Sequence, residues 1–333
     1  MKKILMLLAL LSRFSFADGT NDDFTARCQT ASEEALGKEV SAVEGRNGWL
    51  FFAPELRHLG VGRFWGDAAE KTGRATRADA RDPLPAILEF HRALEAKGVT
   101  LILVPVPPKA VVHARQLFDM PPGARPDPHH QEFYALLRSH GLTVLDLTEP
   151  FREWGGERQG TPYCQQDTHW SGAACVEAAR QIAALAVPIL GNVQRETFSS
   201  EWRTIEITGD LWSMLARPEL PKEKLPVRIV PDSRTDPGSP VILIGDSHTL
   251  IFQAGGDMQA RGAGLADQLA VELGMPVDLI GVRGSGATPA RINLFRRAQQ
   301  NPSYWDNKRI VVWVFAAREF TESDGWRIVP IAP

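Results

Sequence analysis

The chain has 333 residues, of which 44% are hydrophobic and 23% charged, and its formal net charge is −3. This length and apolar content suffice for a large core, in one big domain or two smaller ones. Lys and Arg do not outnumber Asp and Glu, so no basic excess is available to displace counterions from phosphates, and we expect no nucleic-acid partner.

The first residues have the layout of a secretory signal peptide. Lys2 and Lys3 precede the apolar run ILMLLALL, and the small residues Ser15 and Ala17 follow. The run is far shorter than the ~20 residues of a membrane-spanning helix. We expect residues 1–17 to direct export and to be removed, which takes the formal charge from −3 to about −6. Retention of this segment as an interfacial anchor in the membrane is the alternative.

Helical and strand patterns alternate over most of the remaining chain. The polar segment 18–43 is expected to start as a tail, and 44–60 predicts a turn, a short aromatic strand and an irregular continuation. Helical spacing of apolar residues or helix-favouring composition predicts helices at 83–98, 128–141, 171–186, 264–274 and 289–299. β-rich apolar runs predict strands at 99–106, 142–147, 240–247, 277–284 and 309–316.

The strands show almost no polar alternation, which is typical of strands covered on both faces. Such strands alternating with helices predict an α/β fold, a flavodoxin-like three-layer sandwich with a mostly parallel sheet. We expect one catalytic domain over 44–320, with 190–239 as an insertion over the sheet and 321–333 as a C-terminal tail.

Polar clusters follow three of the predicted strands. GDSH follows the strand that starts at 240, RGSGAT the one at 277, and AREF the one at 309. Ligands of open parallel sheets bind beyond the carboxyl ends of the strands. The chemistry is therefore expected along one edge of the sheet.

Ser247 in GDSH is a candidate nucleophile at a strand end. Asp167 and His169 in CQQDTHWSG are two residues apart, so in an extended loop they point to the same side. Asp167 can then accept a hydrogen bond from one nitrogen of His169, which leaves the other free to take the serine proton. A structural Asp-x-His turn is one alternative. Half a metal site, completed by His248 or Asp246, is another.

GDSHT lacks the second glycine of a Gly-x-Ser-x-Gly elbow and resembles the Gly-Asp-Ser block of SGNH hydrolases instead. GVRGSGAT resembles the second block of that superfamily, which implies an oxyanion hole made by the N–H groups of Ser247 and of Gly284 or Gly286. The third block of the superfamily supplies an Asn, whereas WVFAAREF supplies Arg318. We expect Arg318 to bind sugar, to pair with Glu319 or to stabilise charge.

The order of the parts is permuted, because D-x-H precedes the serine. With GRNGWLFF, LVPVPPKAVVHARQL and DTHWSGAA, this order resembles the alginate O-acetyltransferase family in its shorter, single-domain form, over about 44 to 320. The resemblance implies a periplasmic O-acetyltransferase that modifies an exopolysaccharide without a cofactor and receives acetyl from a membrane-bound O-acyltransferase. It implies Ser247 as nucleophile, His169 as base and Asp167 as the residue that orients the base.

Two other functions remain open on the sequence. A polysaccharide acetylesterase would use the same triad with water as acceptor, so esterase side activity is expected. A non-catalytic polysaccharide-binding subunit of an assembly complex would need neither Ser247 nor His169. A mature charge of about −6 opposes the binding of a polyanion such as alginate, because like charges repel. We therefore predict an exopolysaccharide as the acceptor, not alginate specifically.

Further contacts with the substrate are predicted for Trp170, Tyr163 and His248, alongside Arg318. Lys109, in the PPKA turn after a strand, is interpreted as a solvated lysine.

The three cysteines all follow the signal segment. An oxidising compartment allows one disulfide and leaves one thiol over. Cys164 and Cys175 bracket QQDTHWSGAA, so a bridge between them is predicted to pin that loop, although Cys28 could take either partner.

Overall fold

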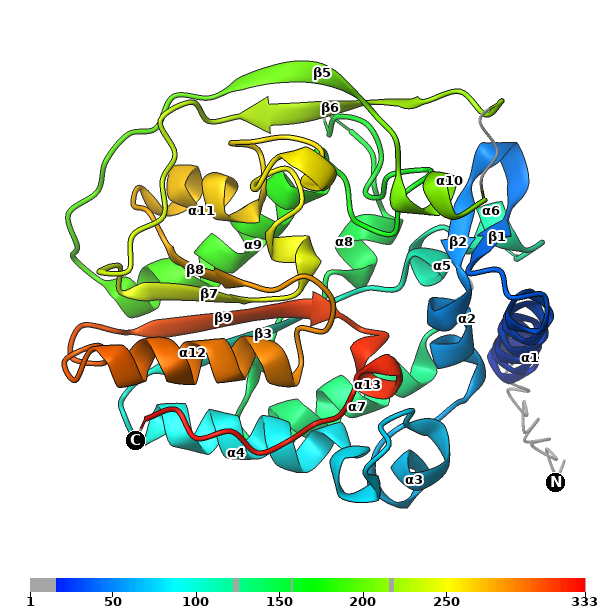
Figure 1. Ribbon diagram of the computed structural model, residues 1–333, viewed down its shortest axis with the longest axis horizontal. Helices are drawn as coiled ribbons and strands as arrows, with labels where there is room; N and C mark the ends of the chain where they lie inside the picture. The colour runs from blue at the N-terminus through cyan, green and yellow to red at the C-terminus, as the bar shows by residue number, and fades with distance from the viewer. Residues whose placement is uncertain (1–15, 122–125, 157, 216–218, 333) are drawn as a thin grey trace, which may run out of the picture.

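The computed structural model describes residues 16–121, 126–156, 158–215 and 219–332. At its centre is a parallel sheet in which the strands lie in the order β4-β3-β9-β7-β8 (Figure 1). The strands are β3 (Thr100–Val106), β4 (Thr143–Val144), β7 (Val241–Gly245), β8 (Asp278–Gly281) and β9 (Ile310–Ala316). All five predicted strands are therefore present, and β9, the last in sequence, lies in the middle.

Helices cover both faces of the sheet. The helices are α4 (Pro83–Glu95), α7 (Pro128–Ser139), α9 (Gly172–Leu190), α11 (Leu265–Leu273) and α12 (Thr288–Gln300). Ile102 and Val104 of β3 belong to the core under α9 and α11, whereas Leu101 and Leu103 belong to the core under α4, α7 and α12 on the other face. Successive side chains of β3 thus enter different cores, which is why its sequence is apolar throughout. The predicted three-layer α/β fold is confirmed.

Helix α9 leads away from the segment that carries His169. Ser171 caps it, as predicted, because its hydroxyl accepts a hydrogen bond from Ala174 N at 3.1 Å. Gly191, at φ +63°, follows its last residue. The helix is long and apolar enough to cross a membrane, but most of it is buried in the protein core.

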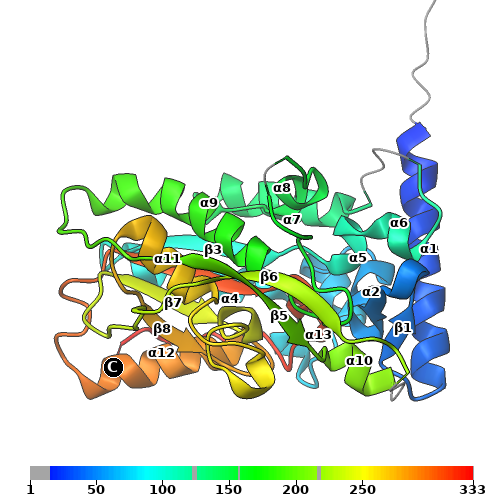
Figure 2. The same ribbon diagram turned by 90° about the horizontal axis from the view of Figure 1, so that it is seen from above.

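The remaining elements surround this sandwich. They are α1 (Phe16–Gly37), β1 (Ala42–Glu44), β2 (Leu50–Phe52), α2 (Ala53–Gly60), α3 (Ala69–Thr72), α5 (Lys109–Val112), α6 (Ala114–Leu117), α8 (Thr148–Arg152), β5 (Glu201–Ile207), α10 (Asp210–Leu215), β6 (Glu223–Ile229) and α13 (Glu319–Glu322). The antiparallel pair β5–β6 lies in the stretch expected as an insertion, and β6 packs on α9 (Figure 2).

Three segments are more ordered than their sequences indicate. Residues 18–37, expected as a polar tail, belong to α1, which packs along α2 and buries Phe24 and Cys28. The irregular continuation expected after the aromatic strand is α2. At the other end, Trp326 of the expected tail is buried. The predicted signal peptide lies almost wholly outside the described residues.

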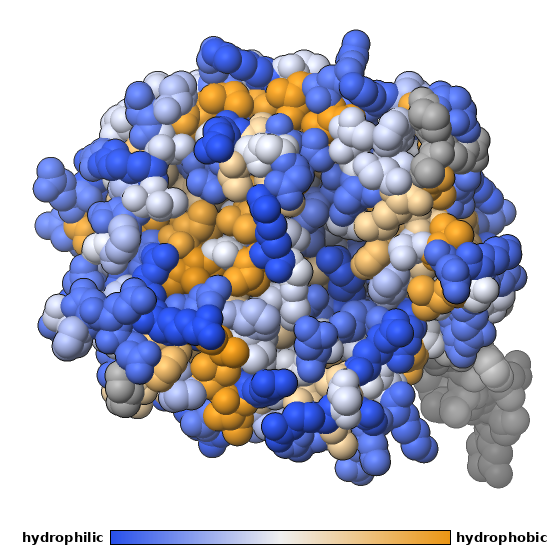
Figure 3. Space-filling model, in the orientation of Figure 1, coloured by the Kyte–Doolittle hydropathy of each residue, from blue (hydrophilic) through white to orange (hydrophobic). Residues whose placement is uncertain are grey.

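The surface is mainly polar on the face that Figure 3 shows, with apolar residues in separate patches. Four large hydrophobic side chains of the described residues are well exposed: Ile189, Trp202, Met214 and Ile328.

Candidate active site

Ser247 lies at the carboxyl end of β7, where the chain turns sharply out of the sheet. Gly245 ends the strand, and an added Cβ there would lie 1.8 Å from the Val314 carbonyl oxygen of β9. Asp246 then caps a short 3-10 turn, Ser247–Thr249, by accepting a hydrogen bond from His248 N. Ser247 is half-buried, so its hydroxyl lies at the edge of the sheet with access from solvent.

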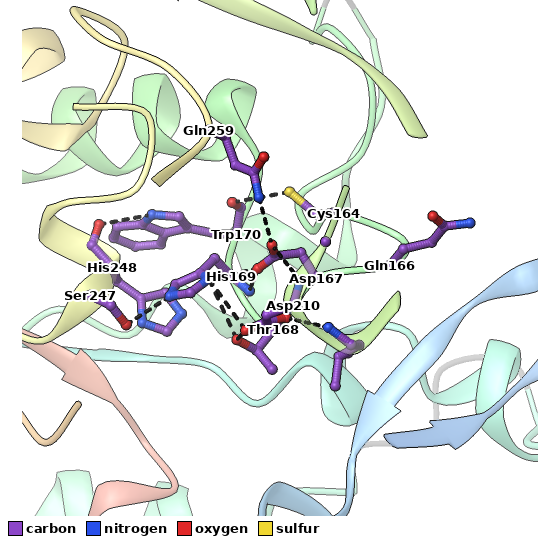
Figure 4. Close-up of polar contacts among 12 residues, drawn as sticks. Cys164, Gln166, Asp167, Thr168, His169, Trp170, Asp210, Ser247, His248 and Gln259 are labelled. Atoms are coloured by element: carbon purple, nitrogen blue, oxygen red, sulfur yellow. Dashed lines mark hydrogen bonds and ion pairs between the residues drawn. The ribbon is translucent and has the colours of Figure 1, made fainter. Parts of the chain in front are cut away.

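The structure brings Asp167, His169 and Ser247 together in one line of hydrogen bonds (Figure 4). His169 Nε2 is 2.7 Å from Ser247 Oγ, and His169 Nδ1 is 2.6 Å from Asp167 Oδ1. The same carboxylate oxygen accepts a hydrogen bond from the backbone N–H of His169 at 3.0 Å. The ring is thus held in the orientation that leaves Nε2 toward the serine hydroxyl.

The electrostatics of the pair favour a basic imidazole. Burial alone would lower the pKa of His169, but the charge of Asp167 and the hydrogen bond to it outweigh burial and raise this pKa above its usual value. For Asp167 burial alone would raise the pKa, but His169 and two backbone N–H groups lower it. Asp167 is therefore ionised at neutral pH.

Lys109 supports the backbone of the segment that carries Asp167. Its side chain is buried, and Nζ donates hydrogen bonds to the carbonyl oxygens of Gln165 and Asp167, both at 3.0 Å. The expectation of a solvated lysine is wrong. The Glu223 carboxylate accepts hydrogen bonds from the N–H groups of Gln165 and Gln166 at 2.7 and 3.0 Å. Two charged side chains therefore hold the backbone of this loop, one as donor and one as acceptor.

Asp210 is a second carboxylate of the site that the sequence did not point to. It accepts hydrogen bonds from Thr168 N and Oγ1, at 2.7 and 2.5 Å, and its N–H donates to Asp167. Its Oδ2 lies 3.9 Å from His169 Nδ1. Burial and the charge of Asp167 raise the pKa of Asp210.

The carboxylates also define where a cation would bind. One ligand atom each from Asp167, His169 and Asp210 lies within 4.8 Å of the others. His248 and Asp246, the third ligands considered from sequence, pair with each other instead, Nδ1 to Oδ1 at 3.0 Å. Both ring nitrogens of His169 are already in hydrogen bonds, Nδ1 with Asp167 Oδ1 at 2.6 Å and Nε2 with Ser247 Oγ at 2.7 Å, so the group is better suited to orienting the imidazole than to holding a metal.

The loop predicted to supply oxyanion donors approaches the turn before the serine. Gly286 is buried, and an added Cβ would lie 2.6 Å from Asp246 N, so only glycine fits there. Gly284 is exposed, with φ +88°. Glu319 holds the residue between the two glycines, because its carboxylate accepts a hydrogen bond from Ser285 Oγ. Burial and the charge of Asp246 raise the pKa of Glu319 to about 7.

Two of the residues predicted to contact the substrate, Trp170 and Tyr163, lie in the hydrophobic core. Trp170 is fully buried and donates from Nε1 to the His248 carbonyl, and Tyr163 is buried with its hydroxyl donating to the Pro107 carbonyl. Neither ring reaches the surface, so the predicted contacts are wrong.

The two remaining substrate candidates differ in exposure. His248 is also buried, with its ring centroid 4.9 Å from that of His169, so its predicted substrate contact is likewise wrong. Arg318 is half-buried, with its guanidinium 5.4 Å from the Phe52 ring centroid. Its charge lowers the pKa of His169, and no ion pair with Glu319 forms within the described chain. Arg318 is therefore the one candidate of the four that is free to meet a ligand.

The predicted disulfide does not form. Cys28, Cys164 and Cys175 are all free and buried. The Cys164 thiol is directed to the Trp170 carbonyl oxygen at 3.5 Å, and Cys175 lies in the apolar first turn of α9. Hydrogen bonds from Lys109 and to Glu223 hold the loop in place of a bridge.

The model of the family described as the SGNH hydrolase-like domain of the acetyltransferase AlgX matches residues 42–317. The chain belongs to this family. It is therefore an enzyme of the acyltransferase class, and the resemblance seen in its motifs is confirmed.

Two curated relatives are similar to this AlgX-family chain over half of its length or more. It is 25% identical to the probable alginate O-acetylase AlgJ of Pseudomonas aeruginosa over 83% of this chain and 69% of that protein. It is 29% identical to the protein of the same name from Pseudomonas syringae pv. tomato, over 55% of this chain and 44% of that protein. The chain thus spans only part of the length of these relatives.

Two solved structures establish the fold of the family in this chain. The O-acetyltransferase domain of Pseudomonas putida AlgJ superposes with a TM-score of 0.62 at 23% identity, covering 85% of this chain and 92% of that one. Pseudomonas aeruginosa AlgX superposes with a TM-score of 0.60 at 15% identity, covering 89% of this chain and 70% of that one.

Proposed function

We propose that this protein is an exported O-acetyltransferase that acetylates hydroxyl groups of an exopolysaccharide through an acetyl-Ser247 intermediate. The observation that carries the proposal is the line of hydrogen bonds from Asp167 through His169 to Ser247, at 2.6 and 2.7 Å, in an acetyltransferase-family fold. The names of the relatives, alginate O-acetylases, support a polysaccharide acceptor.

The first half-reaction loads the enzyme. Ser247 Oγ attacks the carbonyl carbon of an acetyl donor while His169 Nε2 takes the hydroxyl proton. The carbonyl electrons move onto oxygen, where N–H groups of Ser247 and of the loop at Gly284–Gly286 would stabilise the charge. Collapse expels the donor's leaving group, which takes the proton from His169, and acetyl remains on Ser247.

The second half-reaction transfers acetyl to sugar. A sugar hydroxyl gives its proton to His169 and its oxygen attacks the acetyl carbon, after which Ser247 leaves and recovers the proton. Asp167 stabilises the imidazolium that forms in both halves. Since Ser247 is half-buried rather than enclosed, a polymer can approach it from solvent.

The cellular setting extends the proposal. The signal-like residues 1–17 support export to the periplasm, where the polysaccharide would be modified. Acetyl donors of central metabolism are cytoplasmic, so a membrane-bound O-acyltransferase is the proposed source of acetyl.

Acetyl turnover by purified protein tests the chemistry. A chromogenic acetyl ester would be supplied with and without oligosaccharide acceptors, and acetylated sugar would be detected by mass spectrometry. We expect acetyl on the sugar, and loss of at least about 10³-fold in rate for Ser247→Ala. Ser303→Ala, an exposed serine that precedes β9 at the far edge of the sheet, is the matched control and should keep full activity.

The outcomes separate the competing functions. Acetate as the sole product, lost in Ser247→Ala, would identify an acetylesterase. A third result is that the unchanged protein and Ser247→Ala both bind polysaccharide and turn over neither the ester nor acetyl from the membrane-bound donor system. That result would identify a non-catalytic subunit and overturn the proposal.

A further inference from the structure

Gln259 lies beside the triad and has no part in the transfer steps described above. Its side-chain Nε2 donates a hydrogen bond to the Thr208 carbonyl oxygen at 3.0 Å and a longer one to Asp167 Oδ2 at 3.4 Å (Figure 4). The other carboxylate oxygen, Oδ1, is the one that binds the ring of His169. Gln259 therefore reaches the triad through its acid and not through its base.

The backbone of Gln259 has a conformation that residues other than glycine rarely adopt. Its φ and ψ are +68° and −55°, and a hydrogen bond from Ala260 N to the Met258 carbonyl at 2.8 Å spans it. These angles and this bond define a γ-turn of the rare, strained kind. Glycine would form the turn with less strain. Strained residues cluster at functional sites, so the side chain of Gln259 is the feature that needs an explanation.

The loop that contains Gln259, residues 252–263, is held by its own backbone. Its hydrogen bonds, between 2.8 and 2.9 Å long, run from Phe252 N to the Met258 carbonyl, from Gly255 N to the Ala260 carbonyl and from Ala263 N to the Phe252 carbonyl. The loop follows Ser247 closely in the chain. One continuous segment thus supplies the nucleophile at one end of the triad and contacts Asp167 at the other.

The amide of Gln259 completes a set of donors around Asp167. Oδ1 accepts hydrogen bonds from the ring and the backbone of His169, and Oδ2 accepts them from Asp210 N and from Gln259. A carboxylate held at both oxygens cannot rotate without breaking several of these bonds. A neutral amide adds a donor without adding a charge, so it leaves the attraction between Asp167 and the imidazolium in place.

We propose that Gln259 is a positioning residue, whose amide holds the Asp167 carboxylate in the orientation that directs His169 toward Ser247. The inference rests on the function proposed above, because it assigns a further residue to the same triad. Gln259 acts on the base only through Asp167, so its loss should slow the chemical step and leave the affinity for substrate unchanged.

Gln259→Leu removes the donor and keeps most of the side-chain volume. We expect kcat for a chromogenic acetyl ester to fall about tenfold, with KM changed by less than about twofold. Gln181→Leu is the matched control, because it removes a 2.9 Å hydrogen bond to Glu177 within α9. This control should keep full turnover.

Gln259→Gly separates positioning from folding. Glycine adopts the turn without strain, so Gln259→Gly should unfold at a higher urea concentration than Gln259→Leu. Both variants lack the amide and should lose the same activity. Recovery of kcat along with stability in Gln259→Gly would show that the residue serves the fold alone.

A double-mutant cycle tests whether Gln259 acts through Asp167. In the Asp167→Asn protein the carboxylate is already gone, so adding Gln259→Leu should lower kcat by less than about twofold further. A further loss as large as the one in the unchanged background would mean that the two residues act independently, and would contradict the proposed role.

The proton between Asp167 and His169 gives a measurement that needs no turnover. Its low-field ¹H NMR signal, assigned by its absence from His169→Ala, should move in Gln259→Leu and stay in place in Gln181→Leu. An unmoved signal, or equal turnover by these two variants, would overturn the positioning role and leave the acetyl-transfer proposal intact. Absence of turnover by the unchanged protein would overturn the acetyl-transfer proposal instead, and the NMR signal would then decide the role of Gln259.

Discussion

Asp167 makes two hydrogen bonds to His169, one to the ring and one to the backbone, and so controls both the orientation and the basicity of the imidazole. His169 must be neutral to accept the serine proton. Because its pKa is raised, activity is lost as the pH falls through a value above the ordinary histidine pKa of ~6.5. The raised pKa also makes the neutral imidazole a stronger base than a free histidine.

Asp167→Asn removes the charge that raises this pKa. Burial then acts on His169 with less opposition, so the acidic limb of the pH–rate profile should move to lower pH. The rate at the optimum should fall by on the order of 10²–10⁴-fold, because the imidazolium is no longer stabilised. The measurement is kcat/KM for a chromogenic acetyl ester as a function of pH.

Asp210→Asn is a second variant for which a smaller shift of the same pH–rate profile is expected. Its carboxylate lies 3.9 Å from the ring nitrogen, compared with 2.6 Å for Asp167, and its charge also raises the pKa of His169. The acidic limb of the pH–rate profile should move to lower pH in Asp210→Asn, by a smaller amount than in Asp167→Asn. A limb that stays in place in both variants, or moves to higher pH, would contradict the assignment of His169 as the base.

At the scale of elements, the turn that leads from β3 into α5 supports the segment carrying the triad. Lys109 opens α5, and its ammonium donates to two carbonyl groups of that segment. Lys109→Met keeps the length of the side chain and removes the donors. We expect a loss of about 1–3 kcal/mol in the free energy of unfolding, since the Asp167 carbonyl loses its lysine donor and the Gln165 carbonyl keeps only Leu50 N. We also expect a 10–100-fold loss in kcat, roughly, from a displaced base.

Urea unfolding and acetyl-ester turnover of the same preparation check both effects of Lys109→Met. Lys222→Met is the comparison, because Lys222 is 55% exposed and its ion pair with Glu206 spans 3.8 Å. That surface change should alter stability by no more than about 0.5 kcal/mol. Equal behaviour of the two variants would show that Lys109 is not needed to hold the loop.

Elements with long apolar runs were predictable, and so were residues whose partners lie nearby in sequence. The strands around Leu103 and Val312 are apolar because both faces are covered, and Asp167 and His169 pair across two residues. Asp210 was not predictable, because it belongs to none of the motifs and its partner lies 43 residues away. The buried positions of Trp170 and Tyr163 were not predictable either. The sequence near a catalytic motif does not distinguish an aromatic residue that packs in the core from one that faces a ligand.

At the scale of the whole molecule, the order of strands means that the central sheet cannot form until the C-terminal part of the chain is in place. Strand β9 lies between β3 and β7, so the centre of the sheet is completed by nearly the last part of the chain. The segment after α13 then returns across the face covered by α4 and α12. There Trp326 N donates to the Ala80 carbonyl at 2.7 Å, and Arg327 N donates to Thr288 Oγ1 at 3.0 Å. Residues 323–332 are therefore part of the folded unit.

Trp326 is the residue through which this C-terminal segment should contribute most to stability. It is 3% exposed, packs with Trp313 and Phe320, and donates from Nε1 to the Glu319 carbonyl at 3.1 Å. Trp326→Ala should lower the free energy of unfolding by about 3–5 kcal/mol, because it opens a cavity against the sheet and removes the indole donor of that carbonyl, which keeps only the hydrogen bond from Ser323 N at 3.4 Å. Ile328→Ala, two residues on and 64% exposed, should change it by less than about 0.5 kcal/mol. Urea unfolding midpoints of the two variants compare them directly, and equal midpoints would mean that the segment lies on the protein without stabilising it.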